Sequence, residues 1–253
     1  MSIVSFQNKW FIPLEDKTKI RTRLFCFPYA GGNTSVYRNW RESLSPEIGL
    51  WPVQLPGREQ RLLEEPICDL FELARNIADE IEPLLEHPFS FFGHSMGALV
   101  SFEVVRELRR RNCPQPIKLF VSGRHAPQIA NVNLPIHNLR KEEFINQLRK
   151  LNGTPEEVLE NEELMQFFLP MIRADFQAVE TYEYIEEQPL SSSIVVFSGM
   201  DDTEVSMNEL TSWKKQTIKS CNVEMFPGNH FFLHKQKKGI LQTIENEVKD
   251  YYI

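Results

Sequence analysis

The stretch PFSFFGHSMGALVSFEVV, residues 88–105, decides how this chain folds. It opens with a short apolar run, and its last eight residues repeat apolar side chains with the spacing of a helix. Between these two parts lies GHSMG, residues 93–97. A turn this tight strains the backbone of Ser95 and leaves little room beside it, which Gly93 and Gly97 supply. The pattern predicts a strand, a sharp turn and a helix, with the serine hydroxyl lifted above the end of a sheet.

The composition of the chain fits one folded domain over residues 1–253. Hydrophobic residues make up 42% of the sequence, enough for a sizeable core, so global disorder is not expected. The formal net charge is −7, and residues of both signs are spread along the chain. A nucleic-acid-binding protein normally concentrates its basic residues, so we expect no nucleic-acid partner.

The cysteines and the N-terminus predict a reduced, soluble protein. The four cysteines form no C-x-x-C pair and do not cluster with histidines, so we expect neither a metal site nor a disulfide framework. Residues 1–9 lack the charged and apolar regions of a signal peptide. No apolar run approaches the roughly 20 residues that a membrane-spanning helix needs. We therefore expect a cytoplasmic protein that makes no membrane contact and binds no metal or cofactor.

Short apolar runs alternate with helical patterns along the chain. Six runs are expected as strands, over residues 24–27, 50–55, 89–92, 117–122, 194–198 and 223–226. Helices are expected over residues 37–44, 70–84, 96–111 and 240–248. Pro52 makes the second strand weak or places it at an edge, and Asp69 is the expected N-cap of the second helix. Apolar strands separated by helices predict an α/β fold with a mostly parallel central sheet flanked by helices.

One segment, residues 138–187, breaks this alternation because no strand is expected within it. Helical patterns cover residues 141–151 and 162–185, and Thr154, followed by Pro155, is expected to cap a short helix between them. A long helical insertion between two strands of a sheet predicts a lid, because enzymes place gates in surface insertions over their sites. Ordinary helices packed on the sheet are the alternative.

Residues with the chemistry of a catalytic triad follow three of the expected strands. A serine hydroxyl is almost wholly protonated at neutral pH, so a nucleophilic serine needs a base, and the base needs an acid to orient it. After Ser95, the fifth expected strand leads into Asp201 and Asp202, and the sixth leads into PGNH, which ends at His230. Serine, acid and histidine follow in this order in α/β-hydrolases. We predict Ser95 as nucleophile, Asp202 as acid and His230 as base.

Two of these assignments have rivals. Asp201 is the neighbour of Asp202, and the G-x-x-D spacing favours Asp202. His234 lies four residues beyond His230, but the Gly-Asn-His turn favours His230. His94, next to the serine, is expected to face the sheet. A glycine-rich turn without chemistry is the alternative interpretation of the serine motif.

An acyl-transfer site also needs N–H groups that stabilise the negative oxygen of a tetrahedral intermediate. In this fold the residue after the nucleophile supplies one of them, which here is Met96. The second is expected from the loop FPYAGG, residues 27–32, whose paired glycines let the backbone approach a ligand. Ala30 is the candidate donor there, and a plain Gly-Gly turn is the alternative.

Five motifs taken together resemble one family. They are FPYAGG at 27–32, LPGRE at 55–59, GHSMGA at 93–98, GMDDTEV at 199–205 and PGNHFF at 227–232. The set resembles the type II thioesterases, the free-standing hydrolases of nonribosomal peptide and polyketide biosynthesis. The segment FFLPMIRADFQAVETYEY at 167–184 is similar to their lid. The resemblance extends from about residue 24 to residue 232.

The resemblance implies an α/β-hydrolase with a helical lid, a triad and an oxyanion hole. The triad would be Ser95, Asp202 and His230, and the oxyanion hole would use the backbone N–H groups of Ala30 and Met96. The substrate would be an acyl or aminoacyl thioester on the phosphopantetheine arm of a carrier protein, so no cofactor of the enzyme itself is implied. Hydrolysis would remove misprimed or stalled groups and regenerate the free thiol, an editing step in antibiotic biosynthesis.

Two positions depart from the pattern of this family. Tyr29 stands where some members carry histidine, a change that leaves a backbone donor unaffected. Thr203 stands where proline often follows the acid, so the loop around Asp202 is less typical.

The implied partner is a separate acyl or peptidyl carrier protein, which we expect this chain to meet as a monomer. Carrier proteins are generally acidic, and so is this chain, so docking needs a local basic face. Two groups of basic residues are candidates: Lys235, Lys237 and Lys238, and within the lid Arg140, Lys141, Arg149 and Lys150. The triad does not separate thioesters from esters. A medium-chain fatty-acyl carrier thioesterase, a serine carboxylesterase and an acyltransferase of the same fold are therefore alternatives.

Overall fold

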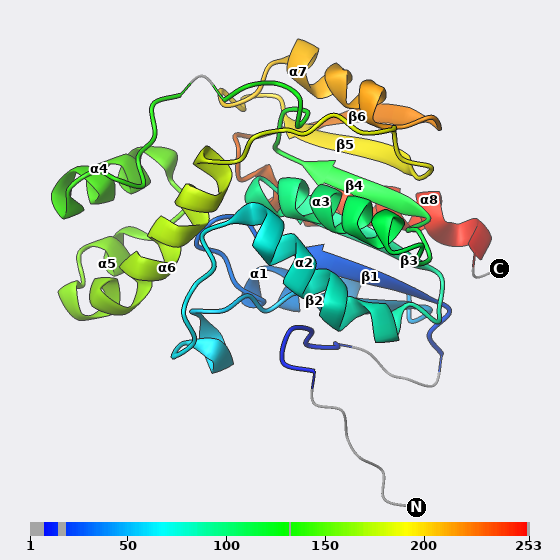
Figure 1. The fold of residues 1–253 in the computed structure, drawn as a ribbon, viewed down its shortest axis with the longest axis horizontal. Coiled ribbons are helices and arrows are strands. Elements are labelled where there is room, and N and C mark those ends of the chain that lie inside the picture. The colour runs from blue at the N-terminus through cyan, green and yellow to red at the C-terminus, as the bar shows by residue number, and fades with distance from the viewer. Residues whose placement is uncertain (1–7, 15–18, 132, 252–253) are drawn as a thin grey trace, which may run out of the picture.

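Six parallel strands form one sheet in the computed structural model, which describes residues 8–14, 19–131 and 133–251 (Figure 1). The strands are β1 (Thr22–Phe27), β2 (Ile48–Pro52), β3 (Phe89–His94), β4 (Lys118–Ser122), β5 (Ser193–Gly199) and β6 (Cys221–Phe226). Their order across the sheet is β2-β1-β3-β4-β5-β6. The strand that contains Pro52 lies at an edge, as predicted, because proline has no N–H to offer a further strand.

The helices largely follow the predicted pattern. They are α1 (Ser35–Arg38), α2 (Leu70–Ile81), α3 (Met96–Arg110), α4 (Lys141–Leu151), α5 (Glu156–Leu159), α6 (Glu162–Glu180), α7 (Met207–Thr211) and α8 (Lys237–Val248). Asp69 caps α2 as predicted, because its side chain accepts the Glu72 N–H at 2.7 Å.

Two helix predictions are wrong, and the helix expected over residues 162–185 ends earlier, at Glu180. The helix expected over residues 37–44 is only the short α1 and a separate 3₁₀ turn at Arg41–Ser43. Tyr37 and Trp40 are both buried, and their rings pack on Phe92 of β3, with 5.9 and 4.8 Å between the ring centroids. Thr154 does not cap α5. Pro155 has an extended backbone with ψ of 142°, so the helix begins one residue later than predicted, without a side-chain cap.

Alternate residues of the strands pack on opposite faces of the sheet. Phe25, Phe91 and Val121 belong to the apolar cluster formed with α2 and α3. The intervening residues Cys26 and Phe92 belong to the cluster formed with α1 and α8. Because both faces are buried, the strands are apolar throughout, which is why the sequence predicted a parallel sheet covered on both sides.

Helices α4, α5 and α6 make up most of residues 138–187, all of which the structure describes and none of which is a strand. Figure 1 shows them together beside one end of the sheet, away from the faces that α2, α3 and α8 cover. They share a small core of their own, formed by Phe144, Leu148, Leu159, Met165, Met171 and Ile172. Asn152 ends α4 in the left-handed conformation, with φ of 62°, and there the chain leaves α4 toward α5.

The turn between β3 and α3 lies where the strand order reverses, between β1 and β3. Ligands of open α/β sheets bind at such a reversal. Ser95 has φ of 53° and ψ of −114°, a strained conformation for a residue with a side chain. A Cβ atom on Gly97 would lie 2.1 Å from the Phe27 carbonyl oxygen, so only glycine lets α3 begin against the end of β1. This contact places Ser95 beside the loop that follows β1.

Candidate functional site

Asp202 and His230 meet where the loops after β5 and β6 touch. A Cβ atom on Gly199 would lie 2.3 Å from the Gly228 carbonyl oxygen, so the two loops pack backbone against backbone. The Asp201 N–H donates to that same carbonyl at 3.0 Å. The packing leaves the Oδ2 atom of Asp202 2.9 Å from the Nδ1 atom of His230.

Of the two neighbouring aspartates, Asp202 is the one that contacts the histidine. Its side chain is 0% exposed, and its Oδ1 atom accepts the Glu204 N–H at 2.9 Å. Asp201 is exposed, and its carboxylate makes no hydrogen bond with any described residue. When the Nδ1–H of His230 donates to a carboxylate, the other ring nitrogen, Nε2, is left free to accept a proton.

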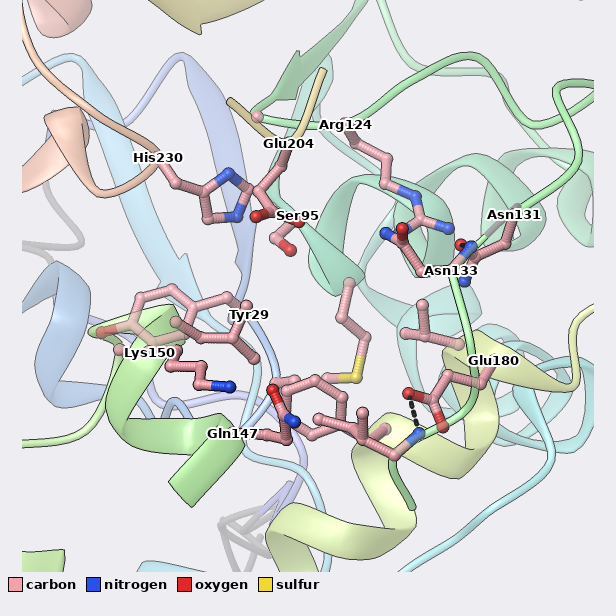
Figure 2. Close-up of a pocket in the computed structure, with 18 of the residues that line it drawn as sticks. Tyr29, Ser95, Arg124, Asn131, Asn133, Gln147, Lys150, Glu180, Glu204 and His230 are labelled. Carbon is pink, nitrogen blue, oxygen red and sulfur yellow. Dashed lines mark hydrogen bonds between the residues drawn. The ribbon is translucent and has the colours of Figure 1, made fainter. Parts of the chain in front are cut away.

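Ser95 and His230 line one cavity of about 840 Å³, together with Met96 and Ala30 (Figure 2). The ring of His230 also packs beside the turn that carries the serine, because its centroid lies 5.1 Å from that of His94. The structure therefore brings the three predicted triad residues to one place, two at the cavity wall and Asp202 behind His230. That they act as a triad stays a prediction.

The other two histidines near the site have different partners. His94 is fully buried, and its Nδ1 atom lies 2.9 Å from the Ser122 hydroxyl oxygen. Burial holds the pKa of His94 well below its usual value, so it is neutral at physiological pH. The Nε2 atom of His234, the rival base, lies 3.2 Å from the Tyr29 hydroxyl oxygen, and His234 has no bond to Asp202.

The loop after β1 makes a tight turn. The Gly32 N–H donates to the Tyr29 carbonyl at 2.8 Å, and Gly31 has φ of 76°, as the third residue of a type II turn requires. In a trans peptide the N–H points away from the preceding carbonyl, so the Ala30 N–H points out of this turn. It donates to no other described residue, and Ala30 and Met96 both line the cavity. Their predicted role as oxyanion donors is compatible with this geometry.

The family model described as a thioesterase domain matches residues 22–248. The chain belongs to the thioesterase family. The gramicidin S biosynthesis protein GrsT of Aneurinibacillus migulanus is 43% identical over 249 residues, which cover 98% of this chain and 97% of that protein. The medium-chain S-acyl fatty acid synthase thioesterase of Rattus norvegicus is 30% identical, over 90% of this chain and 86% of that one.

A solved structure agrees with this membership. The type II thioesterase BorB, from the borrelidin biosynthetic cluster, matches with a TM-score of 0.86 at 34% identity, over 94% of this chain and 97% of that one. The chain is thus a thioester hydrolase with an α/β-hydrolase fold. The resemblance drawn from the five motifs, the fold class and the reaction class are confirmed.

In this thioesterase a buried ion pair ties α6 to the loop after β1. The Nη2 and Nη1 atoms of Arg58 lie 2.7 and 2.9 Å from the two carboxylate oxygens of Asp175. Each of the two side chains is only 3% exposed. Asp175 also accepts the Gly31 N–H at 2.8 Å, and Arg58 donates to the Gly32 carbonyl at 2.8 Å. The pair therefore fixes the two residues that directly follow Ala30.

Glu59 braces the same loop from the neighbouring position. Its carboxylate accepts both the N–H and the hydroxyl of Thr34, at 3.1 and 2.7 Å. Its backbone has φ of 50°, a strained value for a residue with a side chain. Sequence reasoning named LPGRE, residues 55–59, only as part of a resemblance and missed what its charges contact. The signal available in the sequence was Asp175 within a largely apolar helical segment. Nothing in the spacing of the two residues paired it with Arg58.

Further properties of the described residues bear on cofactors and membranes. Within residues 8–14, 19–131 and 133–251, no group of three or more His, Cys, Asp and Glu side chains is arranged to hold a metal ion. None of the helices in that part of the chain is long and apolar enough to cross a membrane.

The two aspartates allow a direct test of the His230 contact. Asp202→Asn should lower kcat for thioester hydrolysis by about 10³- to 10⁴-fold, because an amide does not hold the imidazole in the required tautomer. Asp201→Asn, at the exposed neighbour, should stay within about twofold of wild type. Steady-state kinetics on an acyl-N-acetylcysteamine thioester would measure both variants. A large loss in Asp201→Asn with little effect of Asp202→Asn would contradict the assignment.

Proposed function

We propose that this thioesterase hydrolyses acyl and aminoacyl thioesters on the phosphopantetheine arm of carrier proteins. In this role it removes misprimed or stalled groups during nonribosomal peptide or polyketide synthesis. The observation that carries the proposal is the bond between Asp202 and His230 beside a strained Ser95, in a chain of the thioesterase family. An enzyme in this role would work in the cytoplasm, as a monomer.

The mechanism follows from the roles of the three side chains. The Nε2 atom of His230 takes the proton of the Ser95 hydroxyl while the oxygen attacks the thioester carbonyl carbon. The tetrahedral intermediate collapses, the carbon–sulfur bond breaks, and the imidazolium returns its proton to the departing thiolate. Water then attacks the acyl-serine with the same base, which releases the carboxylic acid and restores the serine. Asp202 stabilises the imidazolium in both halves of the reaction.

The oxyanion of each intermediate would be held by the N–H groups of Ala30 and Met96. Met96 is the first residue of α3, where N–H groups have no partner within the helix. The positive end of the α3 dipole also favours negative charge at this point. Both residues line the cavity that contains Ser95.

The inserted helices, within residues 138–187, would act as the lid of this cavity. Gln147, Lys150 and Leu151 of α4 and Ile172 and Phe176 of α6 form part of its wall. A cavity closed in this way shields the acyl-serine from bulk solvent and selects acyl groups by their fit to the lid.

Deacylation of loaded carrier proteins tests this proposal. Acetyl- and aminoacyl-carrier proteins are incubated with wild type and with Ser95→Ala, and the phosphopantetheine arm is read by mass spectrometry. Wild type should regenerate the free thiol, and the variant should be slower by several orders of magnitude, because the triad acts as a unit. If neither protein deacylates the carriers while wild type cleaves a simple ester through Ser95, the triad stands and the carrier substrate is wrong.

The mouth of the cavity near α4 is the better of the two candidate docking faces. Lys150 lines the cavity, so a carrier bound there could pass its arm directly to Ser95. Arg149 is already paired with Glu156, with 2.7 Å between Nη2 and Oε1. In the other basic group, Lys237 donates to the Asn39 carbonyl at 3.1 Å. We therefore propose that Lys141 and Lys150 contact the acidic carrier.

Charge reversal separates the two faces. Lys141→Glu combined with Lys150→Glu should raise KM for an acyl-carrier protein about tenfold or more at low salt, because like charges then meet. KM for the matching N-acetylcysteamine thioester should change little. Lys235→Glu with Lys238→Glu is the matched control and should change neither value. Equal effects on both substrates, or an effect of the control pair alone, would refute this docking face.

The ion pair between Arg58 and Asp175 should matter for the turnover step. Asp175→Asn keeps an acceptor for the Gly31 N–H but loses the charge, and we expect kcat to fall about 10- to 100-fold while KM changes less than about threefold. Inhibition by a trifluoromethyl ketone thioether, which forms an oxyanion on Ser95, should weaken by a similar factor.

A second buried ion pair supplies the control for general destabilisation. The Nη1 atom of Arg106 lies 2.7 Å from Glu103, both side chains are buried, and neither lines the cavity. Glu103→Gln should lower thermal stability as much as Asp175→Asn but leave kcat unchanged. If the two variants lose kcat in proportion to their melting temperatures, Asp175 has only a structural role.

A further inference from the structure

Arg124 leaves the sheet directly beside the base. It follows β4 after one residue, Gly123, where a Cβ atom would lie 3.3 Å from the Cε1 atom of His230. The Arg124 carbonyl accepts the Trp213 Nε1–H at 2.9 Å, which holds the backbone in place. The side chain lines the cavity of Ser95 and also a smaller neighbouring cavity of about 390 Å³.

The guanidinium of Arg124 has no protein partner among the residues that the structure describes. Its Nε atom is buried and makes no hydrogen bond, and no carboxylate lies within ion-pair distance of the group. Three arginines that are more deeply buried than Arg124 all have acidic partners. Arg58 pairs with Asp175, Arg61 with Glu64 and Arg106 with Glu103, each at 2.7 Å. Arg124 is half-buried and differs from these three arginines in having no acidic partner among the described residues.

Leaving the buried Nε–H of this cation without an acceptor is unfavourable, because that donor loses water and gains no partner. Burial lowers the pKa of Arg124 to about 10, so the side chain still carries its charge at neutral pH. A guanidinium offers five N–H donors and no acceptor. A ligand oxygen is therefore the partner that would satisfy it.

None of the four acidic residues that line the cavity, Glu180, Asp201, Glu204 and Glu209, forms an ion pair with Arg124. Both oxygens of Glu180 accept hydrogen bonds from the backbone of Ile136 and His137, at 2.9 and 3.0 Å. Glu209 is bound to the N–H and hydroxyl of Ser206. Figure 2 shows Arg124 with its polar end toward Asn131 and Asn133. The cavity thus has a polar region on this wall. A plain alkyl chain bound there would leave the N–H donors of Arg124 without an acceptor.

We propose that Arg124 is a specificity-determining residue that binds a second carbonyl or carboxylate oxygen on the acyl group. The inference rests on the proposed function, since it concerns the acyl chamber of that same site. It predicts that oxo-, peptidyl- or carboxy-bearing acyl groups are hydrolysed faster than plain alkyl groups of the same length. Charge-assisted hydrogen bonds from a guanidinium are strong enough to discriminate between such groups.

Three pantetheine thioesters of equal chain length test the proposal. Pentanoyl, N-acetylglycyl and glutaryl groups each have a five-atom backbone, and they differ only in bearing no further oxygen, an amide carbonyl or a carboxylate. The value of kcat/KM is measured for wild type, Arg124→Met and Arg124→Lys. Arg124→Met keeps the bulk of the side chain and removes every donor.

We expect wild type to prefer one or both oxygen-bearing groups, and Arg124→Met to lose about 10- to 100-fold on them with little loss on pentanoyl. Arg124→Lys should restore kcat/KM for the glutaryl thioester more than for the N-acetylglycyl thioester. Lysine keeps the positive charge but lacks the planar guanidinium. The ratio of the glutaryl and N-acetylglycyl rates in wild type then identifies which oxygen is bound.

A matched variant controls for the loss of positive charge alone. Lys235→Met removes one positive charge at a residue that does not line the cavity, and it should leave the ratios between the three thioesters unchanged. An equal loss on all three substrates in Arg124→Met would overturn the proposal and make Arg124 a structural residue. Failure of the proposed function would look different, since wild type would then leave loaded carrier proteins acylated while it still hydrolysed one or more of these pantetheine thioesters.

Discussion

The buried pair between Arg58 and Asp175 is the interaction on which the site depends. It joins three parts of the chain that lie far apart in sequence: the loop after β1, the LPGRE loop and helix α6. Breaking a buried pair by removing one partner costs about 3–5 kcal/mol, because the remaining charge stays buried. Such a pair adds little net stability over apolar packing, so its value lies in geometry. Here it determines where the turn that carries Ala30 sits relative to Ser95.

Close backbone contacts assemble the rest of the site. Gly97 brings the start of α3 against the end of β1, and Gly199 brings the loop of Asp202 against that of His230. At both positions a Cβ atom would come within 2.3 Å of a carbonyl oxygen. The reactive groups are thus placed by main-chain packing at the strand ends. The flexible parts of their own side chains contribute much less to this placement.

The sequence predicted features that depend on local pattern. Strand and helix periodicity, the Asp69 cap and the serine turn all rest on neighbouring residues, and the structure has them. The G-x-x-D spacing also favoured Asp202 over Asp201, and Asp202 is the residue that contacts His230. Features that depend on distant pairing were missed, above all the bond between residues 58 and 175. The broken helix around Tyr37 was missed for a similar reason, because Tyr37 and Trp40 both pack on Phe92 of β3, which is distant in sequence.

The inserted helices are attached in two different ways. Helix α6 is held to the turn after β1 by directional bonds through Asp175, and its Arg173 donates at 2.8 Å to the Leu139 carbonyl, two residues before α4 begins. Helices α4 and α5 meet it through an apolar cluster, which has no fixed register. Directional bonds resist sliding, whereas apolar surfaces permit it. Helix α6 should therefore keep its position relative to the sheet. Acyl groups of different bulk should be accommodated by displacement of α4 and α5 along α6.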